Sequence, residues 1–306
     1  MADTQKGLMD RSSGGWAVLS PRLQADSFGH AHVGALAAYH GRLMVGFFDG
    51  GLAELNDTSD TPMLRAVRDS ASSVWAVNAL LNAGGVLHVA SLRGATRYDG
   101  SRFLAVEGVG AAFSLALTTG GVAIGYGEGV LLPERKLLSS FHGLPGNQAT
   151  ALATAGRGLL VGTPSGLGYV EGLTVRWRVA SGEGRLPHPW VTAILPLEGA
   201  VLVGTYGGGV TRRDGALSDK GAWKPFTETR GLKVNAGCLV SAGGRVYVGT
   251  DGSGLLRLSV DGSRFERLKL SLPSMRITAL FEKDGFLYIG TDEGLTRWSF
   301  EEDAGS

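Results

Sequence analysis

The sequence predicts an all-β fold, a seven-bladed β-propeller made of four-stranded antiparallel blades. Three observations support this prediction: an internal repeat, recurring columns of small and large apolar residues, and an excess of glycine at regular turns. The repeat has a mean spacing of about 41 residues, which matches a propeller blade of roughly 40–45 residues. Its strand centres are Val45, Val89, Ile124, Val161, Val203, Val248 and Ile289.

The strand that precedes each centre is predicted to be the innermost strand of its blade. These strands start near residues 33, 77, 112, 149, 191, 236 and 277. Their third position is small, and the next position is Leu or Ile; the small residues are Ala35, Ala79, Ser114, Ala151, Ala193, Cys238 and Ala279. Because blades converge at the axis, small side chains are favoured there. This column also assigns Cys238 to the core and not to a nucleophilic role.

A strand from the N-terminus is expected to close the ring. Six copies have a candidate fourth strand, at residues 63–67, 102–106, 136–140, 174–179, 223–227 and 265–270, and the seventh copy has none. A spare apolar strand at about residues 16–20 precedes the first copy and is predicted to pair with the strand around 296–300. Closure removes two open sheet edges. Residues 1–306 are thus predicted to form one domain, with residues 1–15 and 301–306 flexible.

Composition excludes several classes of protein. Glycine accounts for 49 of 306 residues, but 43% of the residues are apolar and the glycines are spread along the chain, which argues against disorder. The net charge is +1 without a long basic run, so electrostatic nucleic-acid binding is not expected. No apolar stretch is long enough to span a membrane, and no membrane insertion is expected. The localisation is cytoplasmic as the sequence is written, or periplasmic or secreted if a signal peptide has been removed.

Several segments resemble the two-component regulator propeller repeat. They are the linker 143–145 (Gly-Leu-Pro), the short strand 149–152, the strand 158–163 that ends in Val-Gly-Thr, and the Gly-Leu pair 166–167. The Trp usual before Ile-Gly-Thr is replaced in every copy. Propellers of this bacterial family commonly form sensor regions of membrane-bound histidine kinases. Because no membrane segment or signalling domain occurs in this sequence, the resemblance implies a stand-alone propeller that binds a ligand or a protein.

One face of the ring is predicted to carry the binding site. The connection into each inner strand and the loop between the second and third strands share this face, which we call the top face. Variable loops on a rigid scaffold are where binding residues concentrate. The candidates in the connections are His32, Gln148, Trp190, Asn235 and Arg276, and those in the loops are Phe48, Arg93, Tyr126, Tyr206, Asp251 and Asp292.

These residues favour a non-enzymatic recognition module for a glycan, peptide or protein partner at the mouth of the central channel. No catalytic, metal-binding or cofactor-binding motif is recognised. Two alternatives stay open. One is a lyase or hydrolase similar to streptogramin lyases, which use His, Glu and a divalent metal, for which only His32, Glu128, His188 and Glu293 are available. The other is a scaffold subunit of a larger assembly, because only 19% of the residues are charged.

Overall fold

The computed structural model describes residues 16–18, 32–56, 63–67, 74–183 and 185–300. Within these residues the chain forms seven four-stranded antiparallel sheets, as the sequence predicted. The expected flexibility of residues 1–15 and 301–306, and residues 19–20 of the expected closing strand, lie outside the described residues.

The first three blades take up the N-terminal part of the chain. Blade 1 consists of β2 (Val33–Tyr39), β3 (Arg42–Phe47), β4 (Leu52–Asn56) and β5 (Met63–Val67). Blade 2 consists of β6 (Val77–Ala83), β7 (Val86–Ser91), β8 (Gly94–Tyr98) and β9 (Phe103–Ala105). Blade 3 consists of β10 (Ala112–Thr118), β11 (Gly121–Tyr126), β12 (Gly129–Leu131) and β13 (Leu137–Leu138).

The remaining four blades follow in chain order. Blade 4 consists of β14 (Ala151–Ala155), β15 (Gly158–Thr163), β16 (Gly166–Glu171) and β17 (Thr174–Ala180). Blade 5 consists of β18 (Val191–Leu197), β19 (Ala200–Thr205), β20 (Gly209–Asp214) and β21 (Lys224–Pro225). Blade 6 consists of β22 (Val234–Ala242), β23 (Arg245–Thr250), β24 (Leu255–Leu258) and β25 (Phe265–Arg267). Blade 7 consists of β26 (Ile277–Lys283), β27 (Phe286–Thr291), β28 (Gly294–Ser299) and β1 (Trp16–Val18).

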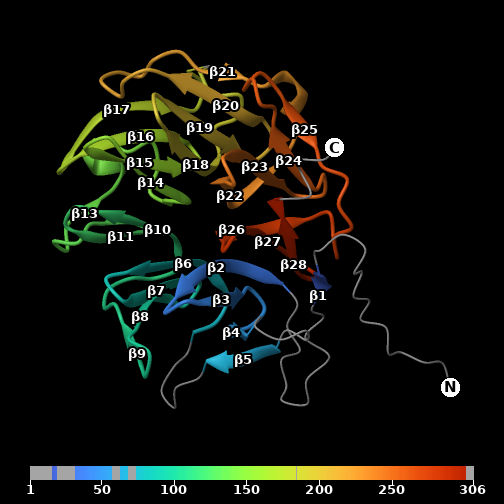
Figure 1. Cartoon of the computed structure of the whole chain (residues 1–306). Helices are drawn as coiled ribbons and strands as arrows, with labels where there is room; N and C mark the ends of the chain where they lie inside the picture. The colour runs from blue at the N-terminus through green and yellow to red at the C-terminus, as the bar shows by residue number, and fades with distance from the viewer. Residues whose placement is uncertain (1–15, 19–31, 57–62, 68–73, 184, 301–306) are drawn as a thin grey trace.

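The first strand of each repeat is the innermost one. Figure 1 shows β2, β6, β10, β14, β18, β22 and β26 around the centre of the ring, with the outer strands at its rim, and neighbouring inner strands contact one another. Short 3-10 helices at Ser140–His142 and Thr227–Thr229 lie in two of the connections between blades. The loop that leads into each inner strand therefore ends near the axis of the ring.

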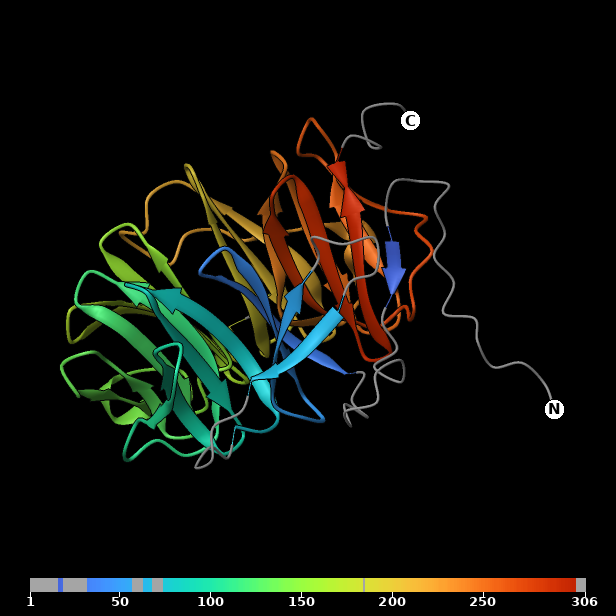
Figure 2. The ribbon, with the colours of Figure 1, turned by 60° about the horizontal axis from the view of Figure 1, so that its bottom comes forward.

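The predicted ring closure is confirmed. Strand β1 pairs antiparallel with β28, with Trp16 opposite Arg297 and Val18 opposite Leu295. Figure 2 shows this blue N-terminal strand beside the red strands of the last blade. The outer strand of blade 7 thus comes from the start of the chain, and its other three strands come from the end.

Hydrogen bonds from side chains join successive inner strands. In six of the seven blades, a polar residue at or near the start of the inner strand donates to a backbone carbonyl at or near the start of the next inner strand, at 2.5–2.9 Å. The pairs are Asn78 with Ala112, Ser114 with Ala149, Thr150 with Val191, Thr192 with Val234, Asn235 with Ile277, and Thr278 with Val33. Blade 1 has Gly34 here, because a β-carbon would lie 2.1 Å from the Val77 carbonyl oxygen. These bonds satisfy backbone oxygens that would otherwise be buried without a donor.

The Val-Gly-Thr or Ile-Gly-Thr sequence at the end of the second strand of blades 4, 5, 6 and 7 also has a packing role. Its glycine leaves room for the β-branched residue that starts the next inner strand, as with Gly162 against Val191 and Gly290 against Val33. Its threonine is fully buried and donates to a carbonyl across the following loop; the pairs are Thr163 with Gly166, Thr205 with Gly209, Thr250 with Gly254, and Thr291 with Gly294. The motif thus couples neighbouring blades and fixes the loop on the top face.

Blade 6 departs from the predicted register. Its inner strand begins at Val234, two residues before the expected start at 236, because it contains a longer bulge than the other blades. Val234 pairs with Thr250, and the next pair is Leu239 with Val248. The extra residues lie between these pairs, where Ala236 is exposed. An expectation based on a constant repeat length could not include them.

Candidate functional site

Each blade contributes two neighbouring positions to the top face. One is the lead-in residue, which directly precedes the inner strand except in blade 4, where Gln148 lies three residues before β14. The other is the loop residue, which directly follows the second strand. The backbone N–H of the loop residue donates to the carbonyl of the lead-in residue of the same blade at 2.8–3.1 Å. These pairs are Phe48 with His32, Leu92 with Ala76, Gly127 with Ala111, Tyr206 with Trp190, and Asp251 with Lys233. The backbone therefore holds the two positions side by side.

The chemistry at these positions differs between the two halves of the ring. Blades 2, 3 and 4 carry small or apolar residues and one amide: Ala76 and Leu92, Ala111 and Gly127, Gln148 and Pro164. Blades 5, 6, 7 and 1 carry aromatic and charged residues, which we call the upper arc: Trp190, Tyr206, Lys233, Asp251, Arg276, Asp292, His32 and Phe48. The candidate site is therefore confined to one side of the top face.

The upper arc begins with an aromatic pair on blade 5. The rings of Trp190 and Tyr206 lie 4.8 Å apart between centroids, and Trp190 is 37% exposed. The ammonium group of Lys233 lies 5.2 Å from the centroid of the Tyr206 ring, within the range of a cation–π interaction. The Tyr206 hydroxyl donates to Asp251 Oδ2 at 3.4 Å, which links this pair to blade 6.

Charged residues form the middle of the arc. Arg276 Nε donates to Asp251 Oδ1 at 2.6 Å, and Arg276 Nη1 donates to Asp292 Oδ2 at 3.2 Å. The hydrogen bond from Arg276 to Asp251 and the nearby carboxylates raise the arginine's pKa. Isolated backbone bridges between Tyr206 and Lys233 and between Asp251 and Arg276 connect loops of successive blades. Arg276 is thus held in one orientation on the top face.

The arc ends on blade 1 with His32 and Phe48, whose rings lie 5.0 Å apart. Burial lowers the pKa of His32, and the carboxylates of Asp292 and Asp49 partly oppose this shift. Asp292 Oδ1 is buried and has no hydrogen-bond partner among the described residues. An imidazole with a lowered pKa, an exposed phenyl ring and a partly satisfied carboxylate therefore meet at this end.

Seven of the eleven predicted site residues lie in the upper arc, and four do not. Gln148 is half-buried on blade 4, and Arg93 is exposed on blade 2 beside Trp75. Asn235 lies within β22 and bonds to the next blade, so its predicted position before the inner strand belongs instead to Lys233. Lys233 was missed because blade 6 carries the extra residues described above.

Tyr126 is buried and does not contribute a side chain to the exposed top face. Its side chain is only 4% exposed and packs in the hydrophobic core with Ala90, Ala112 and Ile124, and burial raises its pKa. In the repeat it occupies the column that holds Thr205 in blade 5. That alignment is the signal that could have placed it at a buried strand end instead of in a loop.

The residues considered for catalysis do not form a recognisable centre. His188 Nδ1 accepts a hydrogen bond from the backbone of Trp190, whereas Glu128 and Glu293 are exposed. Among the described residues, no three His, Cys, Asp or Glu side chains are grouped so that they could hold a metal ion. Cys238 is fully buried, which raises its pKa, and its thiol donates to the Ile277 carbonyl. It is a core residue.

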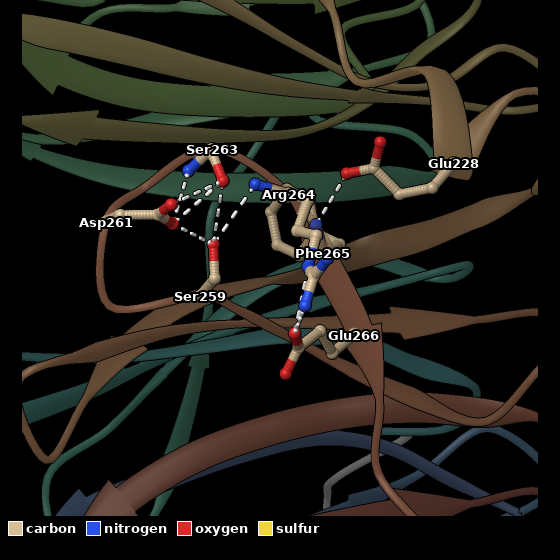
Figure 3. Close-up of polar contacts among 7 residues, drawn as sticks. All are labelled: Glu228, Ser259, Asp261, Ser263, Arg264, Phe265 and Glu266. Carbon is tan, nitrogen blue, oxygen red and sulfur yellow. Dashed lines mark hydrogen bonds and ion pairs between the residues drawn. The ribbon is translucent and has the colours of Figure 1, made fainter.

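A separate polar cluster lies at the turn between β24 and β25 (Figure 3). The hydroxyls of Ser259 and Ser263 donate to Asp261, and these bonds lower the pKa of Asp261 to about 2. Glu228 accepts from the backbone N–H of Phe265 at 2.5 Å. The contacts of Asp261 lie within the turn itself, so they stabilise the turn and do not mark a ligand site.

A family model described as "Two component regulator propeller" matches residues 271–293, which include the lead-in to blade 7, β26 and β27. The chain carries a two-component regulator propeller repeat. The resemblance found in the sequence is thereby confirmed, and the repeat includes Arg276 and Asp292 of the upper arc. No curated protein sequence matches the chain.

Solved structures share the fold of this chain at low sequence identity. The extracellular domain of BT4673 from B. thetaiotaomicron, designated a hybrid two component system, is 18% identical with a TM-score of 0.72 and covers 89% of this chain and 38% of its own. The corresponding domain of BT3049 from that organism is 14% identical with a TM-score of 0.73 and covers 93% of this chain and 41% of its own. The chain thus spans about two fifths of the length of these structures.

Enzymes share the propeller fold as well. Catalytically inactive virginiamycin B lyase from Staphylococcus aureus, determined with quinupristin, is 10% identical with a TM-score of 0.67 and covers 89% of this chain and 96% of its own. In this chain, no helix among the described residues is long and apolar enough to cross a membrane. The fold itself is compatible with both binding and catalysis, so function must be argued from the site.

Proposed function

We propose that this chain is a non-enzymatic recognition domain that binds a glycan, peptide or protein ligand on the upper arc. The observation that carries the proposal is the continuous row of aromatic and charged side chains over blades 5, 6, 7 and 1. Exposed aromatic rings and oriented polar groups are the usual components of a recognition surface. The equivalent positions of blades 2, 3 and 4 lack them, so the repeat itself does not require these residues.

The comparisons support a sensor-type role. BT4673 and BT3049 are extracellular domains of proteins designated two component systems, and we propose that this chain acts in the same kind of compartment, outside the cytoplasm. In such a role, the domain would sense its ligand by binding it on the top face. A catalytic role has less support, because the four residues considered for it are not assembled into a centre.

The proposal is tested by screening for ligands and then substituting the arc. The purified chain is screened by thermal shift against neutral and acidic oligosaccharides and against short peptides. Each compound that stabilises the chain is then titrated calorimetrically. Trp190→Ala and Arg276→Ala are expected to weaken binding at least about tenfold. Leu117→Ala, which removes an exposed apolar side chain on β10, is the control and should bind like the unmodified chain.

Two results would contradict the proposal. One is full retention of binding by both arc variants, which would place the ligand elsewhere. The other is turnover of a compound in the screen, detected by mass spectrometry, that is lost in the arc variants, because the chain would then be an enzyme. Melting curves of the variants establish that they fold.

A further inference from the structure

A second surface lies on the top face over blade 2. Trp75, Leu92 and Arg93 form it, and we call them the blade 2 patch. Trp75 is 45% exposed and Leu92 is 40% exposed. Phe48, 38% exposed at the end of the upper arc, belongs to the neighbouring loop of blade 1.

The backbone fixes these residues close together. Ala76, which follows Trp75, donates its N–H to the Gly50 carbonyl at 2.9 Å, and the Ala76 carbonyl accepts from Leu92 N–H at 3.1 Å. The blade 1 loop, the lead-in to blade 2 and the blade 2 loop therefore meet at Ala76. The exposed apolar side chains form one patch, which is a feature of interaction sites more than of ordinary surface.

The loop that carries Arg93 is held rigidly. Ser91 Oγ donates to the Gly94 carbonyl at 3.0 Å and accepts from Arg93 N–H at 3.2 Å. Gly94 has a φ of +122°, and a β-carbon there would lie 2.8 Å from the Val109 carbonyl oxygen. The loop is thus packed against the connection to blade 3, and Arg93 is presented from a fixed backbone.

Arg93 carries a positive charge that no carboxylate neutralises within the described part of the chain. Its guanidinium carbon lies 5.6 Å from the centroid of the Trp75 ring, and it forms no ion pair there. Arg276, by contrast, is paired with two aspartates, and Arg264 is paired with Glu266. A free guanidinium stacked on an exposed tryptophan is therefore complementary to a carboxylate that sits beside an apolar group.

We propose that the blade 2 patch binds a polypeptide segment in which an acidic residue flanks an apolar side chain. The apolar side chain contacts Trp75 and Leu92, and the carboxylate pairs with Arg93. Tryptophan and arginine are the residues most enriched among interface residues that dominate binding energy. A single cation without a basic cluster does not suit nucleic acid. This inference does not depend on the upper arc, where Arg276 is paired with Asp251 and Asp292.

The test uses a phage-displayed library of random 12-residue peptides selected on the unmodified chain. Enriched peptides are expected to combine Asp or Glu with Leu, Phe or Trp, and synthetic copies of them are measured by fluorescence anisotropy. Trp75→Ala and Arg93→Glu are expected to weaken binding at least tenfold, whereas Arg93→Lys retains part of it. Leu104→Ala, which removes an equally exposed apolar side chain on β9 of the same blade, should bind normally.

Enriched peptides without acidic residues, or peptides that bind Arg93→Glu as well as they bind the unmodified chain, would overturn the inference. Trp190→Ala separates this surface from the upper arc. If peptides lose affinity in Trp190→Ala and keep it in Trp75→Ala, they occupy the arc, and the blade 2 patch is refuted while the proposed function stands.

Discussion

A β-carbon on Gly204 of blade 5 would lie 2.6 Å from Cγ1 of Val234, the first residue of the inner strand of blade 6. The glycine is required here by the neighbouring blade and not by its own backbone conformation. The same relationship links Gly162 to Val191 and Gly249 to Ile277. At the contact between blades 2 and 3, the corresponding pair is Ala90 and Ala112, where a smaller partner permits a larger residue.

Gly204→Ala is therefore expected to destabilise the chain by about 1–3 kcal/mol through overpacking. Combining it with Val234→Ala, which reproduces the natural alanine pair, should cost at least roughly 1 kcal/mol less than the sum of the two single changes. Urea unfolding of the four proteins measures this coupling. Gly127→Ala, where no atom lies within 4 Å, is the control. Strictly additive changes in the free energy of unfolding would show that a β-carbon at position 204 and the Val234 side chain do not interact unfavourably.

Thr192→Val tests the hydrogen bonds between inner strands. Thr192 Oγ1 donates to the Val234 carbonyl at 2.7 Å, and valine keeps the shape of the side chain while removing the donor. The buried carbonyl would lose its partner, so a loss of about 1–3 kcal/mol in the free energy of unfolding is expected. Thr174→Val, on an exposed position of β17, should have little effect. Equal effects at the two sites would argue against these bonds.

Arg213 organises the loop between β20 and β21. Its side chain is only 2% exposed, and its guanidinium donates to the carbonyls of Ala216, Asp219 and Lys220. Arg213→Met should destabilise the chain by roughly 1–3 kcal/mol and release the loop. Limited trypsin digestion should then cleave after Lys220 faster than in the unmodified chain. Arg212→Met, at the half-buried neighbouring position, should leave the cleavage rate unchanged.

His32 gives stability a dependence on pH. Its pKa is lowered below the ordinary value of 6.5 chiefly by burial, so the folded state binds this proton less readily than the unfolded chain does. The contribution of His32 to the free energy of unfolding is fully present above pH 6.5. It decreases as the pH falls below 6.5 and stops changing once the pH is below the lower pKa of the folded state. Urea unfolding at pH 8 and pH 5.5 should show a smaller pH effect in His32→Gln. An identical pH effect in both proteins would refute this assignment.

Removing residues 1–18 should weaken blade 7, because β1 supplies its outer strand. The melting temperature is expected to fall by about 5 °C or more, since a few kcal/mol of pairing and burial are lost from the domain. Exposure of the β28 edge should also promote association of the chains, which light scattering measures. Removing only residues 1–12 keeps β1 and is the control. Equal melting temperatures of the two shortened chains would contradict the role of β1.

The repeat was sufficient to predict the blades, because packing against two neighbours imposes the same small and β-branched residues at the same positions in each copy. Ring closure followed from the missing fourth strand of the last copy. The predicted register was wrong in blade 6, because its inner strand contains extra residues. As a result, Asn235 was predicted to precede this strand, whereas Lys233 occupies that position. Tyr126 was misplaced because an aromatic residue at a strand end can either be exposed or replace a buried threonine.

The contacts within the upper arc could not be predicted from the sequence. Arg276 follows Asp251 by 25 positions and precedes Asp292 by 16, and only the ring places the three side chains together. The restriction of the arc to blades 5, 6, 7 and 1 was not predicted, because the candidates in the sequence included Gln148, Arg93 and Tyr126 of blades 4, 2 and 3. The repeat therefore determines which residues share a face. The folded ring determines which of these residues form hydrogen bonds and ion pairs with one another.

Pairing of β1 with β28 also has a consequence for how the chain is made. Because β1 precedes the other six blades in the sequence and β28 follows them, a ribosome must synthesise all six before the last blade can be completed. Until then, six blades can assemble but the circle stays open, and sheet edges remain available to other nascent chains. Closure of the ring therefore has to wait for the synthesis of β28.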